Sequence, residues 1–112
     1  MIDWPALEQF FKGKQAAVDK VVAMALATNG EVPAKLRAAA AEGDLAALAT
    51  MAHKLKGMGG SLRAHQVHAL ATQAEASARQ GRADAVDLAL QLADALEILL
   101  AELARRSTAQ NP

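Results

Sequence analysis

The stretch EGDLAALATMAHKLKG, residues 42–57, holds the end of one predicted helix and the start of the next. Glu42 and Gly43 are typical of a helix C-terminus, and Asp44 is a good N-cap for the helix that follows. Beyond the cap, apolar residues return every three or four positions, as on one face of a helix: Leu45, Leu48, Met51, Ala52 and Leu55. The spacing predicts a helix over residues 44–58.

The rest of the chain continues this helical pattern. Its 112 residues are 53% hydrophobic but only 3% aromatic, and alanine and leucine dominate, which favours helices over sheets. Apolar stripes predict a short helix at 3–12 and longer helices at 14–42, 62–80 and 83–106. We expect an all-α fold in one domain over residues 1–112, an antiparallel up-down four-helix bundle with a short N-terminal capping helix.

The segment at residues 29–33 holds residues that disfavour a continuous helix. Asn29, Gly30 and Pro33 fall inside the range 14–42, so we expect a kink near Gly30, with a loop that splits the helix as the alternative. Asp3 can cap the N-terminal helix. We interpret the aromatic side chains and two methionines as core packing: Trp4, Phe10, Phe11, Met51 and Met58.

The charges bound the range of partners. Twelve basic residues balance twelve acidic ones and cysteine is absent, so we expect no nucleic acid or membrane partner and no thiol chemistry. No segment approaches the roughly 18 apolar residues of a membrane span, and Asp3 and Glu8 argue against a signal peptide. We therefore expect a monomeric cytoplasmic protein.

His53 is predicted to point away from the apolar stripe of its helix. Its neighbours three and four positions away are Ala49, Thr50, Lys56 and Gly57, most of them small where long polar side chains are usual. An exposed imidazole on a flat surface beside lysines suits transfer of a phosphoryl group. No ATP-binding loop or acidic metal cluster is visible, so a partner must supply the catalytic groups. The alternative is an ordinary solvated histidine.

The motif AHKLKG, residues 52–57, resembles the signature of histidine-containing phosphotransfer (HPt) domains of bacterial phosphorelays. The segments IDWPALEQFFKGK, LRAAAAEGDLAALATMAHKLKG and ALATQAEASARQG are similar to the family's start, its central stretch and its next helix, which carries an acidic residue, here Glu75. The resemblance implies a carrier, not an enzyme, that shuttles a phosphoryl group between aspartates of response-regulator receiver domains. A hybrid sensor histidine kinase is the implied source. The resemblance also implies that this chain has no cofactor of its own and that Mg²⁺ is bound by the receiver.

The resemblance assigns roles to individual residues. His53 is the implied phosphoacceptor, through Nε2, with Lys56 as the phosphoryl-stabilising cation and Lys54 as supporting charge. We assign the receiver-docking surface to small residues around the histidine: Ala49, Thr50, Gly57 and Gly60. One departure is Arg63, which stands where the family commonly has glycine; we interpret it as a surface residue, and a receiver contact is the alternative.

Two further hypotheses concern a metal site and a binding role without phosphotransfer. His65 and His68 share one side of their helix, but a spacing of three without a compelling third ligand does not predict a metal site, so we assign none. A helical adaptor of the same fold that binds receiver or kinase domains without phosphotransfer is the functional alternative. It predicts that His53 is replaceable.

Overall fold

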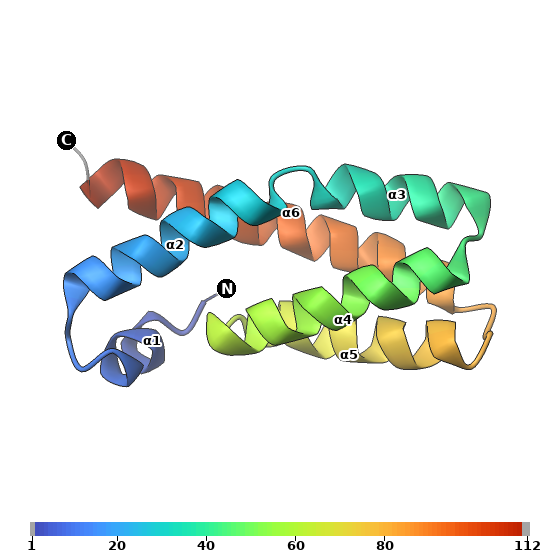
Figure 1. Cartoon of the computed structure of the whole chain (residues 1–112), viewed down its shortest axis with the longest axis horizontal. Helices are drawn as coiled ribbons and strands as arrows, with labels where there is room; N and C mark the ends of the chain where they lie inside the picture. Colours follow the sequence, from blue (N-terminus) through green and yellow to red (C-terminus); the bar gives the residue numbers. More distant parts are fainter. Residues whose placement is uncertain (1, 111–112) are drawn as a thin grey trace.

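The computed structural model describes residues 2–110, and its regular structure there is entirely helical. Figure 1 shows the elements in chain order. The helices are α1 (Trp4–Phe10), α2 (Gln15–Asn29), α3 (Val32–Glu42), α4 (Leu45–Ser61), α5 (His65–Arg79) and α6 (Ala85–Gln110). The predicted all-α class is confirmed. None of these helices is both long enough and apolar enough to span a membrane.

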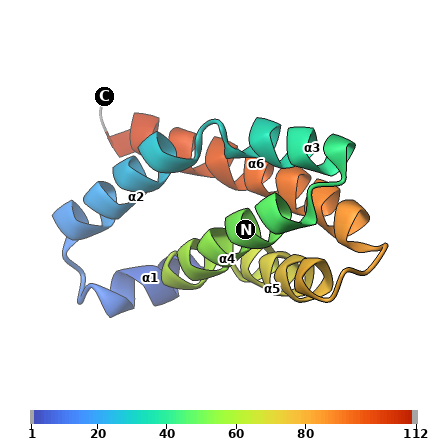
Figure 2. The same cartoon turned by 45° about the vertical axis from the view of Figure 1, so that its right-hand side comes forward.

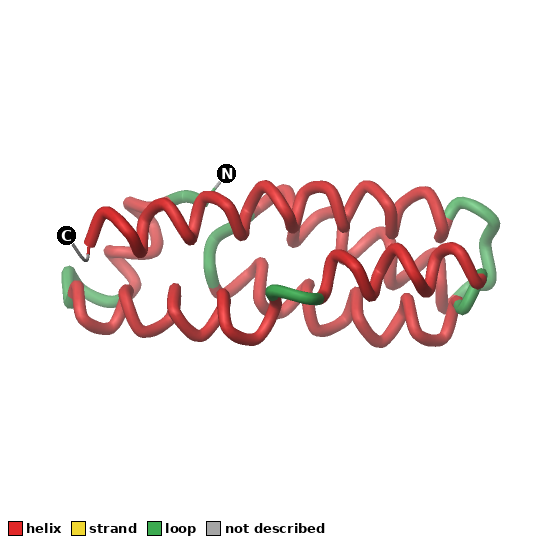
Figure 3. The backbone as a smooth tube through the Cα atoms, turned by 90° about the horizontal axis from the view of Figure 1, so that it is seen from above, coloured by secondary structure: helices red, strands yellow, loops and turns green. Residues whose placement is uncertain are grey.

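The long helices form a bundle of four rods. α2 and α3 follow one another along one rod, and α4, α5 and α6 make the other three, each running opposite to the one before it (Figures 1 and 2). The molecule is elongated, with extents of 43 × 23 × 17 Å. Seen from above, loops lie at both ends of the molecule, and the break between α2 and α3 and the turn between α4 and α5 lie further in (Figure 3).

The core lies along the axis of the bundle and is built of leucine and alanine. Leu36, Leu48, Leu55 and Leu96 are each at most 1% exposed, and burial of such apolar side chains is the main favourable contribution to folding. Alanines such as Ala52, which is 0% exposed, let neighbouring helices approach closely. The predicted stripe of the 44–58 helix therefore faces the core.

The prediction of one helix over residues 14–42 is wrong in one respect, because this range forms two helices. α2 ends at Asn29 and α3 begins at Val32, with Pro33 in its first turn. Pro33 has no N–H to donate to the carbonyl four residues earlier, so the backbone ladder is interrupted there. The buried side chain of Asn29 donates to the Ala25 carbonyl at 2.9 Å. Gly30 and Glu31 form the break, which was the stated alternative to a kink.

α4 runs to Ser61, three residues beyond the predicted end, and passes through Gly59 and Gly60. Its end is a left-handed cap at Arg63, with φ of 60°. The Ala64 N–H donates to the Gly59 carbonyl at 2.8 Å and the Arg63 N–H to the Gly60 carbonyl at 3.2 Å, which is a Schellman motif. The same cap ends α3 at Gly43, with φ of 66°.

Arg63 thus takes the backbone conformation that glycine adopts most easily, at the position where the sequence departs from the HPt pattern. Its side chain donates to the Gly60 carbonyl at 2.8 Å and lies over the Phe10 ring, 5.0 Å from the centroid. These contacts offset part of the backbone cost. The contacts are internal, in keeping with its interpretation as an ordinary residue. The other helix limits also shift, since α5 begins at His65 rather than 62 and α6 spans Ala85–Gln110 rather than 83–106.

The N-terminal helix closes one end of the bundle. Asp3 caps it as predicted, accepting from the Ala6 N–H at 3.1 Å, and the Asp3 N–H donates to the Arg63 carbonyl at 3.0 Å. Trp4 and Phe11 pack against the core. The prediction for Phe10 is wrong, because this side chain is 61% exposed and packs edge-on against Phe11 beside Arg63.

Candidate functional site

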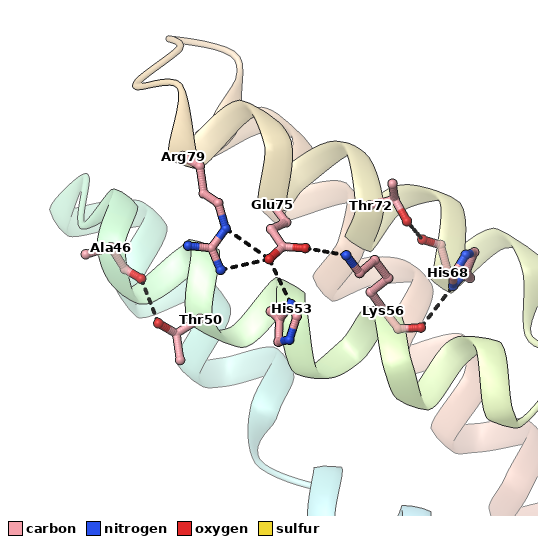
Figure 4. A network of polar contacts seen from close by, with 8 residues as sticks. All are labelled: Ala46, Thr50, His53, Lys56, His68, Thr72, Glu75 and Arg79. Carbon is pink, nitrogen blue, oxygen red and sulfur yellow. Dashed lines mark hydrogen bonds and ion pairs between the residues drawn. The ribbon is translucent and has the colours of Figure 1, made fainter.

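His53 lies on the outer face of α4, and its side chain is 62% exposed, as predicted. Its Nδ1 is 2.9 Å from Oε2 of Glu75 on α5 (Figure 4). An ionised carboxylate can only accept a hydrogen bond, so Nδ1 carries the proton in this pair. In the neutral ring, Nε2 then has a free lone pair. The structure therefore offers one defined nucleophilic nitrogen.

Glu75 is the centre of a polar network between α4 and α5. Its side chain is only 10% exposed, and it meets Lys56 Nζ at 2.7 Å through Oε1. Its Oε2 accepts from Arg79 Nη2 at 2.8 Å and Arg79 Nε at 3.0 Å. Hydrogen bonds from Lys56 and Arg79 lower the pKa of Glu75 to about 2 from its ordinary 4.5. Glu75 is therefore ionised at neutral pH.

The two lysines assigned to the site lie on opposite flanks of α4. Lys56 reaches Glu75 and so lies beside His53, with its side chain 35% exposed. Lys54 instead lines a groove of about 490 Å³ between α2, α3 and α4, whose lining includes neither His53 nor Glu75. Successive residues of a helix point about 100° apart, which separates Lys54 from the histidine. The structure brings Lys56 to the site but not Lys54.

Two of the predicted docking residues are open. Thr50 is exposed, and its hydroxyl donates to the Ala46 carbonyl at 3.1 Å. Gly57 is exposed, and a Cβ placed there meets no described atom within 4 Å. A partner can therefore approach His53 closely from this side.

Of the other two docking residues, Ala49 is buried, which corrects the prediction for it, and Gly60 is half-buried. Ala49 is 5% exposed, because it shares the side of α4 that faces α5, seven positions before Lys56. Gly60 lies under the imidazole of His68, and a Cβ added to it would be 3.4 Å from His68 Nδ1. Ala49 therefore contributes to helix packing, whereas Gly60 stays partly accessible beside His68.

The remaining two histidines contact different partners. His68 Nδ1 is 2.9 Å from the Lys56 carbonyl, which ties α5 to α4. His65 Nε2 lies 3.8 Å from Asp3 Oδ2, next to the N-terminal helix. Within residues 2–110 no group of three histidines or carboxylates is placed to hold a metal ion.

The structure adds two residues to the surroundings of His53 that were not predicted there, Glu75 and Arg79. Glu75 is the acidic residue of the resembling segment and lies two turns after His68, but neither it nor Arg79 is predicted to contact His53. Their spacing of four on one helix predicts an ion pair between them. The hydrogen bond from His53 to Glu75 crosses 22 residues, so helical periodicity carries no signal for it.

Comparison with known proteins assigns the family. The family model of the Hpt domain matches residues 20–106, which is more than half of the chain. The chain therefore belongs to the Hpt domain family, whose members are phosphocarrier modules that interact with receiver domains and kinases in two-component phosphorelays. No curated protein and no solved structure matches it.

Proposed function

We propose that this chain is a phosphorelay intermediate in which His53 Nε2 accepts a phosphoryl group from the aspartate of one receiver domain and passes it to another. The observation that carries the proposal is the hydrogen bond of His53 Nδ1 to Glu75, at 2.9 Å. It leaves Nε2 free on an exposed face beside Lys56 and Gly57. A histidine that served only as surface filler would not need a buried carboxylate on its inner nitrogen.

The chemistry of the transfer follows from this geometry. The Nε2 lone pair attacks phosphorus, and an N–P bond forms as the bond from phosphorus to the aspartate oxygen breaks. The aspartate leaves as a carboxylate with that electron pair. The ring becomes positively charged because Nδ1 keeps its proton, and Glu75 stabilises this charge as the carboxylate does in a His–Asp pair. Lys56 is close enough to turn toward the phosphoryl oxygens.

The partner supplies the rest of the machinery in this proposal. We expect the receiver to bring Mg²⁺ and its acidic pocket, and a hybrid sensor histidine kinase to stand upstream. The docking surface is the open face of α4 at Thr50 and Gly57, continued by the groove that Lys54 lines. A monomer in the cytoplasm, docking transiently, suits a carrier that must serve two partners in turn.

The test is phosphotransfer from a phosphorylated receiver domain to purified protein, followed by intact mass and acid lability of the product. We expect wild type to take one acid-labile phosphate and His53→Gln to take none. His65→Gln is the matched control, since His65 is also an exposed histidine, and it should behave as wild type. Phosphate on His53→Gln would contradict the site assignment. Binding without transfer in wild type would favour the adaptor.

A further inference from the structure

Resting on that proposed function, we propose that Arg79 is a positioning residue, the counter-ion that keeps Glu75 charged and in place when Lys56 turns to the phosphoryl group on His53. The carboxylate then continues to hold Nδ1–H of the phosphorylated ring. Arg79 acts through Glu75 and does not itself contact the phosphoryl group.

The two carboxylate oxygens of Glu75 contact different cations (Figure 4). Lys56 Nζ meets Oε1 at 2.7 Å. Arg79 donates through Nε and Nη2 to Oε2, at 3.0 and 2.8 Å, and this is the oxygen that faces His53 Nδ1. Loss of Lys56 from Oε1 therefore leaves every contact at Oε2 intact.

The charges explain why a second cation is needed. With neutral His53, one carboxylate and two cations give the network a charge of +1. An arriving phosphoryl group brings nearly two negative charges, and Lys56 is the cation beside His53 that can pair with it. Without Arg79, the carboxylate of Glu75, only 10% exposed, would then lack a cation. An unpaired carboxylate that is shielded from water favours its protonated form, and a protonated Glu75 would no longer stabilise the ring.

The position of Arg79 suits this role. It lies on the same helix as Glu75, one turn later, so their pairing does not depend on how α4 moves when a partner docks. It also lies in the last turn of α5, where a cation interacts favourably with the helix dipole. Its guanidinium can donate two N–H groups to one oxygen, which a lysine cannot do with fixed geometry.

A double-mutant cycle of Arg79 and Glu75 tests the effect of Arg79 on phosphotransfer. We expect Arg79→Gln to lower the equilibrium constant for transfer from receiver to this chain roughly twofold to fivefold, the size set by one partly solvated ion pair. Arg79→Lys should recover part of the loss. In a Glu75→Gln background the substitution of Arg79 should have no further effect, because there is no charge to balance. Arg105→Gln, an exposed arginine on α6, is the control and should match wild type.

A second experiment needs no phosphoryl group, so its result tests the role of Arg79 independently of the proposed function. Lys56→Gln mimics the moment when Lys56 has left Glu75. Carbon NMR of the Glu75 carboxyl should show its pKa still below the ordinary 4.5 in Lys56→Gln, and at or above it once Arg79→Gln is added. A low pKa in that double variant overturns the inference, whether or not His53 accepts phosphate. So does an unchanged effect of Arg79→Gln in the Glu75→Gln background.

Discussion

At His53, the nucleophilic nitrogen is determined by which ring nitrogen donates a hydrogen bond to Glu75. The contact of Nδ1 with the ionised Glu75 carboxylate favours the Nδ1–H tautomer, and the exposure of the side chain leaves Nε2 open to solvent. The His–Asp pair of hydrolases uses the same logic, with the carboxylate behind the ring rather than on the reacting atom. The residue that needs protection from water is therefore Glu75, and it is the buried one.

Removing the carboxylate should slow the transfer without unfolding the bundle. We expect Glu75→Ala to lower the transfer rate roughly tenfold, the lower end for a hydrogen bond to a charged acceptor in a site open to solvent. Nitrogen NMR of His53 should show less of the Nδ1–H form. The helical signal in circular dichroism serves as the control, and an unchanged tautomer in Glu75→Ala would contradict the assignment.

The lowered pKa of Glu75 has a consequence for stability. A carboxyl whose pKa is depressed in the folded state stabilises the fold above its unfolded pKa and loses that contribution as the pH falls toward the folded value. The difference in unfolding free energy between wild type and Glu75→Gln should therefore be constant above the ordinary pKa of 4.5. It should shrink as the pH falls from there to about 2. Urea unfolding across that range measures it, and a difference that grows in acid would refute the network.

At the scale of elements, the glycines of α4 serve two purposes. Gly57 faces open space, whereas a Cβ on Gly59 would lie 2.9 Å from the backbone nitrogen of His68, where α4 and α5 cross. The first glycine leaves the surface beside His53 low, as the proposed docking requires, and the second permits the close contact of α4 with α5. Sequence alone shows the same residue type at both positions.

Alanine substitution should distinguish the two glycines. Gly59→Ala should destabilise the protein by about 1–3 kcal/mol, because the backbone of α5 must move. Gly57→Ala should instead stabilise it by up to about 1 kcal/mol through helix propensity. Chemical unfolding of both variants gives the comparison. Equal effects at the two positions would contradict the close crossing.

The left-handed cap at Arg63 predicts that two substitutions that remove its side chain differ in stability. Arg63→Gly and Arg63→Ala both lose the contacts with Gly60 and Phe10, but only glycine adopts a φ of 60° at little cost. We expect Arg63→Gly to be more stable than Arg63→Ala by about 1 kcal/mol. Thermal and urea unfolding check this. The reverse order would show that the left-handed cap is absent.

These elements also show what the sequence could predict. Periodicity located the helical regions and the outward direction of His53, because both depend on local spacing. It favoured a kink over the break at Gly30, because the apolar stripe keeps one phase across both helices. It ended α4 too early, because glycines of weak helix preference can adopt helical geometry when tertiary contacts reward it. It placed Ala49 on the open surface because a single helix does not show where its neighbour lies.

On the scale of the whole molecule, the histidine and the groove lie on adjoining faces of α4. The groove contains three methionines, of which Met24 is 60% exposed. Among its described lining residues are Lys35 and Lys54 and no acidic side chain. A receiver that covers both faces would combine apolar contact with attraction for acidic residues at its edge.

That surface can be tested with a pair of matched substitutions. We expect Met24→Gln to weaken receiver docking by roughly threefold to tenfold, as for the loss of one apolar contact at an interface. Ile98→Gln on α6 is the control, since Ile98 is similarly exposed at 57%, and it should leave docking unchanged. Titration calorimetry gives the Kd values. Equal weakening by both variants would rule out the groove as the docking face.

The polar network also has a place in the order of folding. His53, Lys56, Glu75 and Arg79 belong to α4 and α5, two helices joined by the turn at residues 62–64. Contacts of short sequence separation form early, before the ends of a chain meet. We therefore expect this hairpin to bring its carboxylate and histidine together first, so that α6 packs against a pair of helices that already carries the network.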